Sequence, residues 1–203
     1  MKTKPRQIGI TGGIGSGKSY VCQLFAAYQI PIYEADKRAH QVMEEDSDLK
    51  AAIISLFGSK SYIDEGKLNR AYLAEVVFNQ TSKIKQLENL VHPAVARDYA
   101  AWVASQKAAP YVLKEAALLF ETGSYLQLDA TILVSAPLET RLERVQKRDP
   151  HRTREQILAI IAKQMPDAEK EKLATYHLDN SPWADIKAQV AALHQILIAS
   201  SMA

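Results

Sequence analysis

Cysteine is almost absent from this chain of 203 residues, which contains only Cys22. One thiol excludes an intrachain disulfide and an all-cysteine metal site, and it suits a reducing compartment. Apolar runs of the ~18 residues that a membrane helix needs are also missing. Lys2, Lys4 and Arg6 are followed by glycine before an apolar stretch builds up, so we expect no signal peptide. We therefore expect a cytoplasmic monomer or small homo-oligomer with no membrane partner.

Net charge is low as well, because 25 Lys and Arg face 23 Asp and Glu, which leaves +2. This field is too weak to predict nucleic-acid binding, so an anionic ligand has to meet a local basic site. Hydrophobic residues make up 47% and charged residues 24%, which excludes disordered, collagen-like and coiled-coil chains. The length predicts one domain with room for an insertion.

Short apolar segments alternate with longer helical patterns, which predicts an α/β fold with a parallel sheet. The predicted strands, short and rich in β-branched or aromatic residues, are 7–10, 30–33, 111–113, 131–134 and 176–178. The predicted helices are 18–28, 37–45, 49–57, 70–78, 83–91, 93–105, 138–147, 154–163, 167–174 and 182–199. Thr153 and Gln156 predict a capping box.

The predicted strands are unevenly spaced. Residues 36–109 hold only helical patterns, far more than a βαβ crossover needs, so we expect a helical insertion at 37–106. A second excursion, at 139–166, is the expected lid, and the remaining core comprises 1–36, 107–138 and 167–203. A basic cluster marks the lid: Arg141, Arg144, Lys147, Arg148, Arg152 and Arg154.

Residues 12–19 read Gly-Gly-Ile-Gly-Ser-Gly-Lys-Ser, after an apolar strand and before a helix. This G-x-x-x-x-G-K-S/T pattern predicts a P-loop, whose backbone N–H groups and helix N-terminus point at phosphate oxygens. We expect Lys18 to reach the β- and γ-phosphates of a nucleoside triphosphate and Ser19 to bind Mg²⁺. The other expected nucleotide contacts in this stretch are Gly13, Gly15, Ser16, Gly17 and Tyr20.

Two other nucleotide-binding classes are disfavoured. Lys18 stands where a G-x-G-x-x-G dinucleotide fingerprint starting at Gly13 needs its third glycine. The guanine-reading N-K-x-D pattern is absent, since no asparagine is followed by lysine, and no aspartate has glycine three positions later. The sequence therefore argues against a dinucleotide-binding fold and against a GTPase.

Asp36 comes just after the second predicted strand, and ligands of such sheets bind beyond the carboxyl ends of the strands. A carboxylate there can accept the proton of a substrate hydroxyl as that hydroxyl attacks the γ-phosphorus. Alternatively, Asp36 caps a helix that begins at Lys37. Position alone supports both roles equally, and Glu34 carries the same ambiguity with a less favourable placement.

An ordered set of motifs resembles the dephospho-coenzyme A kinase family over nearly the whole chain. The set comprises the P-loop, Glu34-Ala35-Asp36, Leu68-Asn69-Arg70, His92-Pro93, Leu118-Leu119-Phe120-Glu121, the basic segment at Arg148, Gln164, and Asp179-Asn180. The resemblance implies phosphorylation of the ribose 3′-hydroxyl of dephospho-coenzyme A by ATP with Mg²⁺, the last step of coenzyme A biosynthesis. It also implies a P-loop fold: a five-stranded parallel sheet flanked by helices, an inserted helical substrate subdomain and a small helical lid.

The resemblance further implies roles for single residues. Asp36 becomes the general base, Lys18 the phosphate-binding lysine and Arg148 the catalytic lid arginine. Arg144 is the alternative lid residue that contacts the nucleotide, and Asn180 is expected near adenine. The expected acceptor contacts are Asp36, His40, Arg70, His92 and Glu121.

Alternatives stay open for three of these residues. Arg148 can belong to a solvated helix face, His92 can be a buried histidine ahead of Pro93, and Asn180 can be a turn residue.

Four positions depart from the family pattern: Glu34 for aspartate, Tyr20 for threonine, His40 for arginine and Ala117 for proline. The His40 change alters one expected contact with a substrate phosphate. Glu115, at the end of the third strand, is a further carboxylate that can hold Mg²⁺ through water, with Lys114 beside it.

Two competing functions remain. One is a P-loop kinase for another small molecule, such as a nucleoside or nucleotide, which a panel of acceptors would distinguish. The other is a regulatory module that closes on ATP and forms no product with any acceptor.

Overall fold

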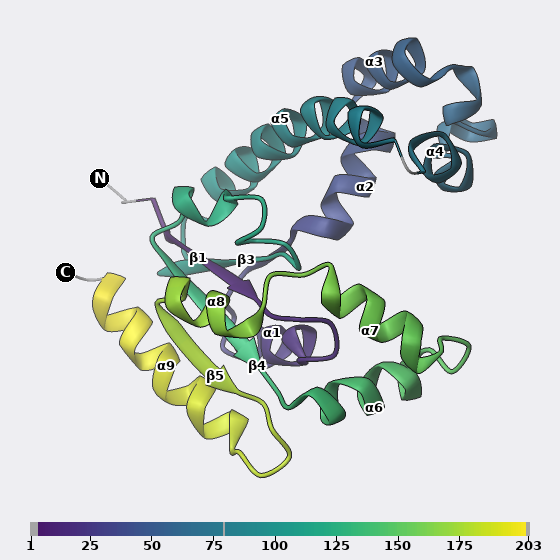
Figure 1. Cartoon of the computed structure of the whole chain (residues 1–203). Coiled ribbons are helices and arrows are strands. Elements are labelled where there is room, and N and C mark those ends of the chain that lie inside the picture. Colours follow the sequence, from purple (N-terminus) through teal and green to yellow (C-terminus); the bar gives the residue numbers. More distant parts are fainter. Residues whose placement is uncertain (1–3, 79, 202–203) are drawn as a thin grey trace. The chain divides into compact units, whose positions relative to one another are not determined.

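A computed structural model describes residues 4–78 and 80–201 of the chain (Figure 1). The chain divides into two compact units. The helical unit is Ala35–Ser105, and the core unit comprises the chain up to Glu34 and from Gln106 onward. The helical unit thus begins two residues before, and ends one residue before, the insertion expected at 37–106. Within the described residues, no helix has the length and apolar character needed to cross a bilayer.

The core unit is built on five parallel strands in the order β2-β3-β1-β4-β5. Their bounds are β1 Arg6–Thr11, β2 Ile32–Glu34, β3 Tyr111–Glu115, β4 Ala130–Ser135 and β5 Tyr176–Asp179. All five predicted strands are confirmed, with ends that shift by at most two residues. β1 lies at the centre between β3 and β4, with Ile10 opposite Glu115 and Thr11 opposite Leu133. The loop that follows β1 is therefore placed at the middle of the sheet edge.

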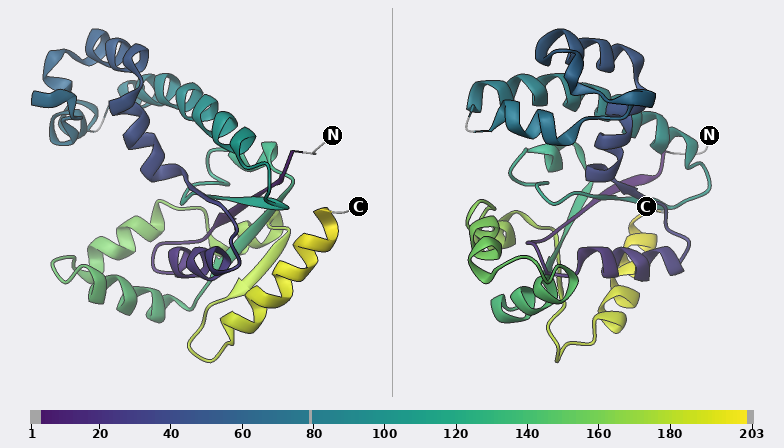
Figure 2. Two further views of the ribbon diagram at one scale, coloured as in Figure 1. Left: turned by 180° about the vertical axis from the view of Figure 1, so that it is seen from behind. Right: turned by 90° about the vertical axis from the view of Figure 1, so that its right-hand side faces the viewer.

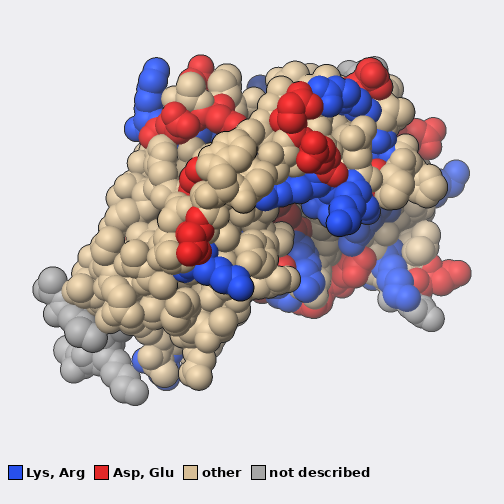
Figure 3. Space-filling model, turned by 90° about the horizontal axis from the view of Figure 1, so that it is seen from below, with Lys and Arg blue, Asp and Glu red and all other residues tan. Residues whose placement is uncertain are grey.

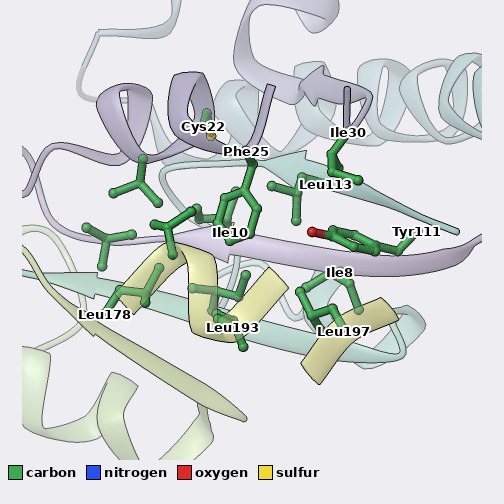
Figure 4. Close-up of a cluster of buried hydrophobic side chains, with 14 of the residues drawn as sticks. Ile8, Ile10, Cys22, Phe25, Ile30, Tyr111, Leu113, Leu178, Leu193 and Leu197 are labelled. Carbon is green, nitrogen blue, oxygen red and sulfur yellow. The ribbon is translucent and has the colours of Figure 1, made fainter. Parts of the chain in front are cut away.

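Two helices, α1 (Lys18–Ala27) and α9 (Ile186–Ser201), contact each other and cover one face of this sheet. Their apolar side chains, including Phe25, Leu193 and Leu197, pack on Ile8 and Ile10 of β1 (Figure 4). Both isoleucines are fully buried, as is typical of a parallel strand covered on both faces. The other helices of the core unit follow β4: α6 (Leu138–Arg148), α7 (Arg154–Ala162) and α8 (Asp167–Leu173). The predicted capping box at Thr153 and Gln156 is confirmed at the start of α7.

The helical unit has its own apolar core. Its helices α2 (Ala35–Glu45), α3 (Ser47–Phe57), α4 (Arg70–Val77) and α5 (Thr81–Ser105) pack against one another (Figure 2). Single turns of 3₁₀ helix, η1 (Ser59–Ser61) and η2 (Asp64–Gly66), lie between α3 and α4, and a third, η3 (Ser124–Gln127), lies in the core unit. Val42, Ile53, Phe57, Leu73 and Val91 are buried at the centre of the helical unit.

Two helix predictions are wrong. Residues 81–105 form one helix of 25 residues, with Pro93 inside it, instead of two helices. An internal proline costs about 3 kcal/mol, but Val91 and Ala94 on either side are buried in the helical unit's core, and this packing keeps α5 continuous. The last helix begins at Ile186 instead of residue 182. Asp185 accepts a hydrogen bond from the Ala188 N–H at 3.0 Å, which caps α9 at that point.

A histidine and a tyrosine are paired inside the core unit. His194 of α9 and the hydroxyl of Tyr111 on β3 are 2.7 Å apart, and the Tyr28 ring stacks on the imidazole at 4.3 Å. Burial lowers the pKa of His194 below its ordinary value. The folded state therefore favours the neutral imidazole.

We expect the free energy of unfolding to fall on mild acidification because of this histidine. The pKa of His194 in the unfolded chain is about 6.5, so the unfolded state binds its proton first. Stability should be constant above that pH and should decline as the pH falls from about 6.5 through the lower folded-state pKa. Urea unfolding of the wild type and of His194→Gln, at several pH values from 7.5 to about 5, measures the difference. The variant should have a shallower slope, and parallel slopes would contradict the assignment.

Candidate active site

Residues 12–17, between β1 and α1, form a glycine-rich loop (Figure 1). Gly15 and Gly17 have φ angles of +79° and +91°, which favour glycine. Gly17 caps α1 without a side-chain hydrogen bond, so the first N–H groups of α1 have no carbonyl partner within the helix. Ser16 is buried, and its Oγ has no hydrogen-bond partner among the described residues. The loop thus presents N–H donors, a hydroxyl and a positive helix end to an anion.

Lys18 folds back over this loop. Its Nζ donates to the Gly12 carbonyl oxygen at 3.1 Å and lies 4.0 Å from Oε1 of Glu115, at the end of β3. The ammonium group is therefore held at the mouth of the loop. Tyr20, in the first turn of α1, is exposed. The phosphate contacts of Lys18, Tyr20 and the loop residues stay predictions.

A pocket of about 180 Å³ lies beside the first turns of α1. Ser19, Glu34 and Glu115 are among its lining residues, and the two glutamates are paired across β2 and β3. Hydroxyl and carboxylate oxygens suit Mg²⁺, which usually takes one or two carboxylates, several waters and substrate phosphates. Within the described residues, no three His, Cys, Asp or Glu side chains form a complete metal cage. The oxygens of Ser19, Glu34 and Glu115 therefore suit a Mg²⁺ ion whose remaining ligands come from water and from the phosphates of a bound nucleotide.

Cys22 lies in the wall of the same pocket. Burial, helped by the negative charge of Glu115, raises the pKa of its thiol to about 12. The thiol is therefore protonated at neutral pH, the form that is the weaker nucleophile.

Asn180 and Arg144 hold the backbone of the glycine-rich loop with hydrogen bonds. The Asn180 side-chain amide donates to the Ser16 carbonyl oxygen at 2.7 Å, and a Cβ on Gly17 would collide with that amide. Arg144 donates to the same carbonyl at 3.4 Å and to the Asn180 carbonyl at 2.9 Å. Both side chains make hydrogen bonds to backbone here, and their predicted nucleotide contacts stay predictions.

The basic cluster of residues 141–154 does not form one exposed face. Arg141 is only 4% exposed. Arg152 and Arg154 pair with Asp149 and Glu139, at 3.0 and 2.8 Å. Basic side chains on the α6–α7 side are accordingly interleaved with acidic ones (Figure 3).

Arg148 differs from these arginines, because it is exposed and forms no ion pair with any described residue. Its guanidinium is therefore available to a ligand. The basic run by itself assigns Arg141 no separate role. Its burial is indicated by its place on the apolar stripe of α6, three residues after Leu138 and four before Val145.

Glu121 lies in the turn that follows β3, and it contacts residues of the core unit. Its Oε1 accepts from the Met165 N–H at 2.9 Å and lies 3.0 Å from Nζ of Lys170, which is fully buried. Burial raises the pKa of Glu121, but hydrogen bonds from the backbone and from Lys170 outweigh burial and leave that pKa below its usual value. The ionised carboxylate joins this turn to α8. Its predicted acceptor contact stays a prediction.

The helical unit brings Asp36, His40 and Arg70 together in a pocket of about 490 Å³. His40 Nδ1 lies 2.8 Å from the Asp36 carbonyl oxygen, one turn earlier in α2. Because α2 begins at Ala35, Asp36 lies in its first turn, and the cap of a helix starting at residue 37 is the wrong interpretation. His92 is exposed on α5, so the interpretation of a buried histidine is also wrong. His92 is not among the residues that line this pocket.

Comparisons with known proteins agree with one another. A family model described as dephospho-CoA kinase matches residues 6–185. A dephospho-CoA kinase of Bradyrhizobium diazoefficiens is 39% identical over 189 residues, which cover 92% of each chain. A crystal structure from Thermus thermophilus superposes with a TM-score of 0.82 at 37% identity, covering 96% of this chain and 97% of the other. A dephospho-CoA kinase from Campylobacter jejuni gives a TM-score of 0.64 at 25% identity, covering 96% and 98%. The chain therefore belongs to the dephospho-CoA kinase family.

Proposed function

We propose that this protein transfers the γ-phosphoryl group of ATP to the ribose 3′-hydroxyl of dephospho-CoA, giving CoA and ADP. The observation that carries this proposal is the family match over residues 6–185. It is supported by a glycine-rich loop with a lysine at its mouth, at the end of the central strand. ATP and dephospho-CoA are the proposed partners, Mg²⁺ the proposed metal and the cytoplasm the proposed compartment.

The loop residues and Lys18 would bind the triphosphate. Their N–H groups and the ammonium face the β- and γ-phosphates and stabilise the charge that moves toward ADP. Ser19 would hold the Mg²⁺ that accompanies ATP, with Glu34 and Glu115 positioned to bind its water ligands. When bound, this ion neutralises phosphate charge.

Asp36 would accept the proton of the 3′-hydroxyl. As the new O3′–P bond forms, the bond from phosphorus to the β-phosphate oxygen breaks, ADP leaves, and the proton passes to the carboxylate. Asp36 is two residues after Glu34, which lines the Ser19 pocket, so the chain tethers the two Cα atoms within about 7 Å. Arg70 and His40 of the helical unit's pocket would bind acceptor phosphate and ribose.

Incubation with ATP, Mg²⁺ and dephospho-CoA, followed by mass spectrometry, tests the function. One added phosphate on the acceptor is expected, and it should be lost when EDTA is present. Nucleosides, nucleotides and small sugars serve as competing acceptors. Phosphorylation of one of these alone would favour another small-molecule kinase. ATP binding without product from any acceptor would favour the regulatory module.

Residues 139–166 are the proposed lid, and Arg148 is its proposed catalytic group. Arg148→Ala should lower kcat by ~10²-fold with little change in KM for dephospho-CoA, because the guanidinium would act on charge that develops in the transition state. Lys147→Ala, at the neighbouring exposed position of α6, is the matched control. Amide hydrogen exchange in α7 should slow when an ATP analogue and dephospho-CoA bind together. An active Arg148→Ala enzyme with unchanged exchange would contradict the lid.

A further inference from the structure

Ile14, in the middle of the P-loop, is held at both of its backbone polar groups by side chains from outside the loop. Nε of Arg141 donates to its carbonyl oxygen at 2.9 Å. Its N–H donates to Oε1 of Gln164 at 3.0 Å. These two side chains come from opposite ends of the 139–166 segment. The Ile14 side chain also packs against the apolar cluster of α6 and α7, which comprises Leu142, Val145, Ile157 and Ile161.

Arg141 is fixed independently of any ligand. Its Nη1 pairs with Oδ2 of Asp167 at 2.6 Å, and its side chain is only 5% exposed. Asp167 opens α8 and Gln164 lies just before it, next to Met165, whose N–H donates to Glu121. We call Arg141, Gln164 and Asp167 the Ile14 clamp. A planar guanidinium suits this position, because one fork can reach the Ile14 carbonyl and the Asp167 carboxylate together.

Two P-loop glycines show how closely α6 approaches. The three nearest atoms that a Cβ on Gly13 would meet all belong to the Arg141 guanidinium, and Cζ would be only 2.6 Å away. The φ angle of Gly13 is not in the left-handed region. Glycine is needed there because the Arg141 guanidinium occupies the space that a Cβ would take, and not because the backbone is strained. Gly15 differs, because its φ is +79° and its Cβ would collide with the Arg141 carbonyl oxygen.

We propose that Arg141, with Gln164 and Asp167, is a positioning residue for nucleotide binding. The inference rests on the proposed function and adds that the clamp fixes the Ile14 peptide, so that the neighbouring N–H groups converge on phosphate. A glycine-rich loop loses much conformational entropy when it is ordered. A loop ordered in advance does not lose that entropy on binding, so the clamp raises nucleotide affinity without touching the nucleotide.

Isothermal titration with Mg·ADP tests this, because it needs no turnover. Arg141→Gln should raise Kd by ~10-fold. Arg141→Lys keeps a charge for Asp167 but cannot span both partners, so it should not restore the affinity. Arg97→Gln, which breaks an exposed ion pair with Asp46 in the helical unit, is the matched control and should leave Kd unchanged. In steady-state assays of Arg141→Gln, KM for ATP should rise while KM for dephospho-CoA does not.

A merely structural arginine would give a lower melting temperature with wild-type Kd in the folded variant, and that result overturns the inference. Wild-type protein that binds Mg·ADP but does not phosphorylate dephospho-CoA overturns the proposed function alone. In that case the inference is still decided by the ratio of the Kd values of Arg141→Gln and wild type for Mg·ADP.

A double-mutant cycle with Gly13→Ala sharpens the test. In the wild type, the added methyl collides with the buried guanidinium and should raise Kd for Mg·ADP by ~10-fold. In Arg141→Gln the same change should add less than ~2-fold. Gly15→Ala is the control, since its clash involves backbone and should cost the same in both backgrounds. An equal cost of Gly13→Ala in both backgrounds overturns the inference. Arg141→Lys replaces Arg141→Gln in the cycle if the latter does not fold.

Discussion

Lys18→Ala is expected to lower kcat by ~10³-fold while the protein stays folded. The contacts of the Lys18 ammonium group with the Gly12 carbonyl oxygen and with Glu115 are polar. Its loss therefore removes little stability. It does remove the cation that we propose faces the bond between the β- and γ-phosphates, where negative charge develops during transfer. The measurement is kcat with dephospho-CoA at saturating ATP.

Lys187→Ala, at an exposed position of α9, provides the control for removal of a lysine. Thermal unfolding monitored by circular dichroism should give both variants melting temperatures close to that of the wild type. A folded Lys18→Ala enzyme with nearly normal kcat would show that this loop is not the working phosphate site.

The sheet could be predicted because its signals are local. β1 and β4 are short apolar runs bounded by turns. The G-x-x-x-x-G-K-S pattern places the start of α1 at Lys18. The order β2-β3-β1-β4-β5 could not be predicted by the same means. It depends on the side of β1 on which each following strand is added to the sheet, and no single segment of the sequence carries that information.

The errors occurred where packing overrides local preference. Proline predicts a break in any isolated helix, yet α5 continues through Pro93 because buried residues flank it. An arginine in a basic run predicts a solvated side chain, yet Arg141 is buried against the P-loop with Asp167 as its partner. That partner is 26 residues away in the sequence, so a local pattern cannot reveal the pair.

The candidate site was predictable in part. The P-loop is contiguous in sequence, so its motif defines it. The residues predicted to bind the acceptor are dispersed in the sequence, and the fold of the helical unit brings Asp36, His40 and Arg70 into one pocket. Asn180 and Glu121 were predicted to contact ligands, but a motif cannot distinguish a side chain that contacts a ligand from one that holds backbone. In the structure both make hydrogen bonds to backbone groups.

Asp36→Asn is expected to lower kcat by ~10²–10⁴-fold and to leave the Kd for ATP unchanged. Asparagine has nearly the same size and keeps the hydrogen-bonding oxygen, but it cannot take up the proton of the attacking hydroxyl. The nucleotide is proposed to bind at the P-loop, and Asp36 is not part of that loop. Separate measurements of kcat with dephospho-CoA and of ATP affinity by titration should therefore diverge.

Asp48→Asn is the matched control, because Asp48 is also an exposed aspartate in the first turn of a helix, α3 of the same unit. Both substitutions remove a negative charge near a helix N-terminus, at a cost of about 0.3–1 kcal/mol of stability. The two variants should therefore lose similar stability, and only Asp36→Asn should lose kcat. If Asp36→Asn keeps wild-type kcat, Asp36 only stabilises the start of α2. The proton acceptor would then have to be sought at Glu34 or Glu115, the carboxylates that line the Ser19 pocket.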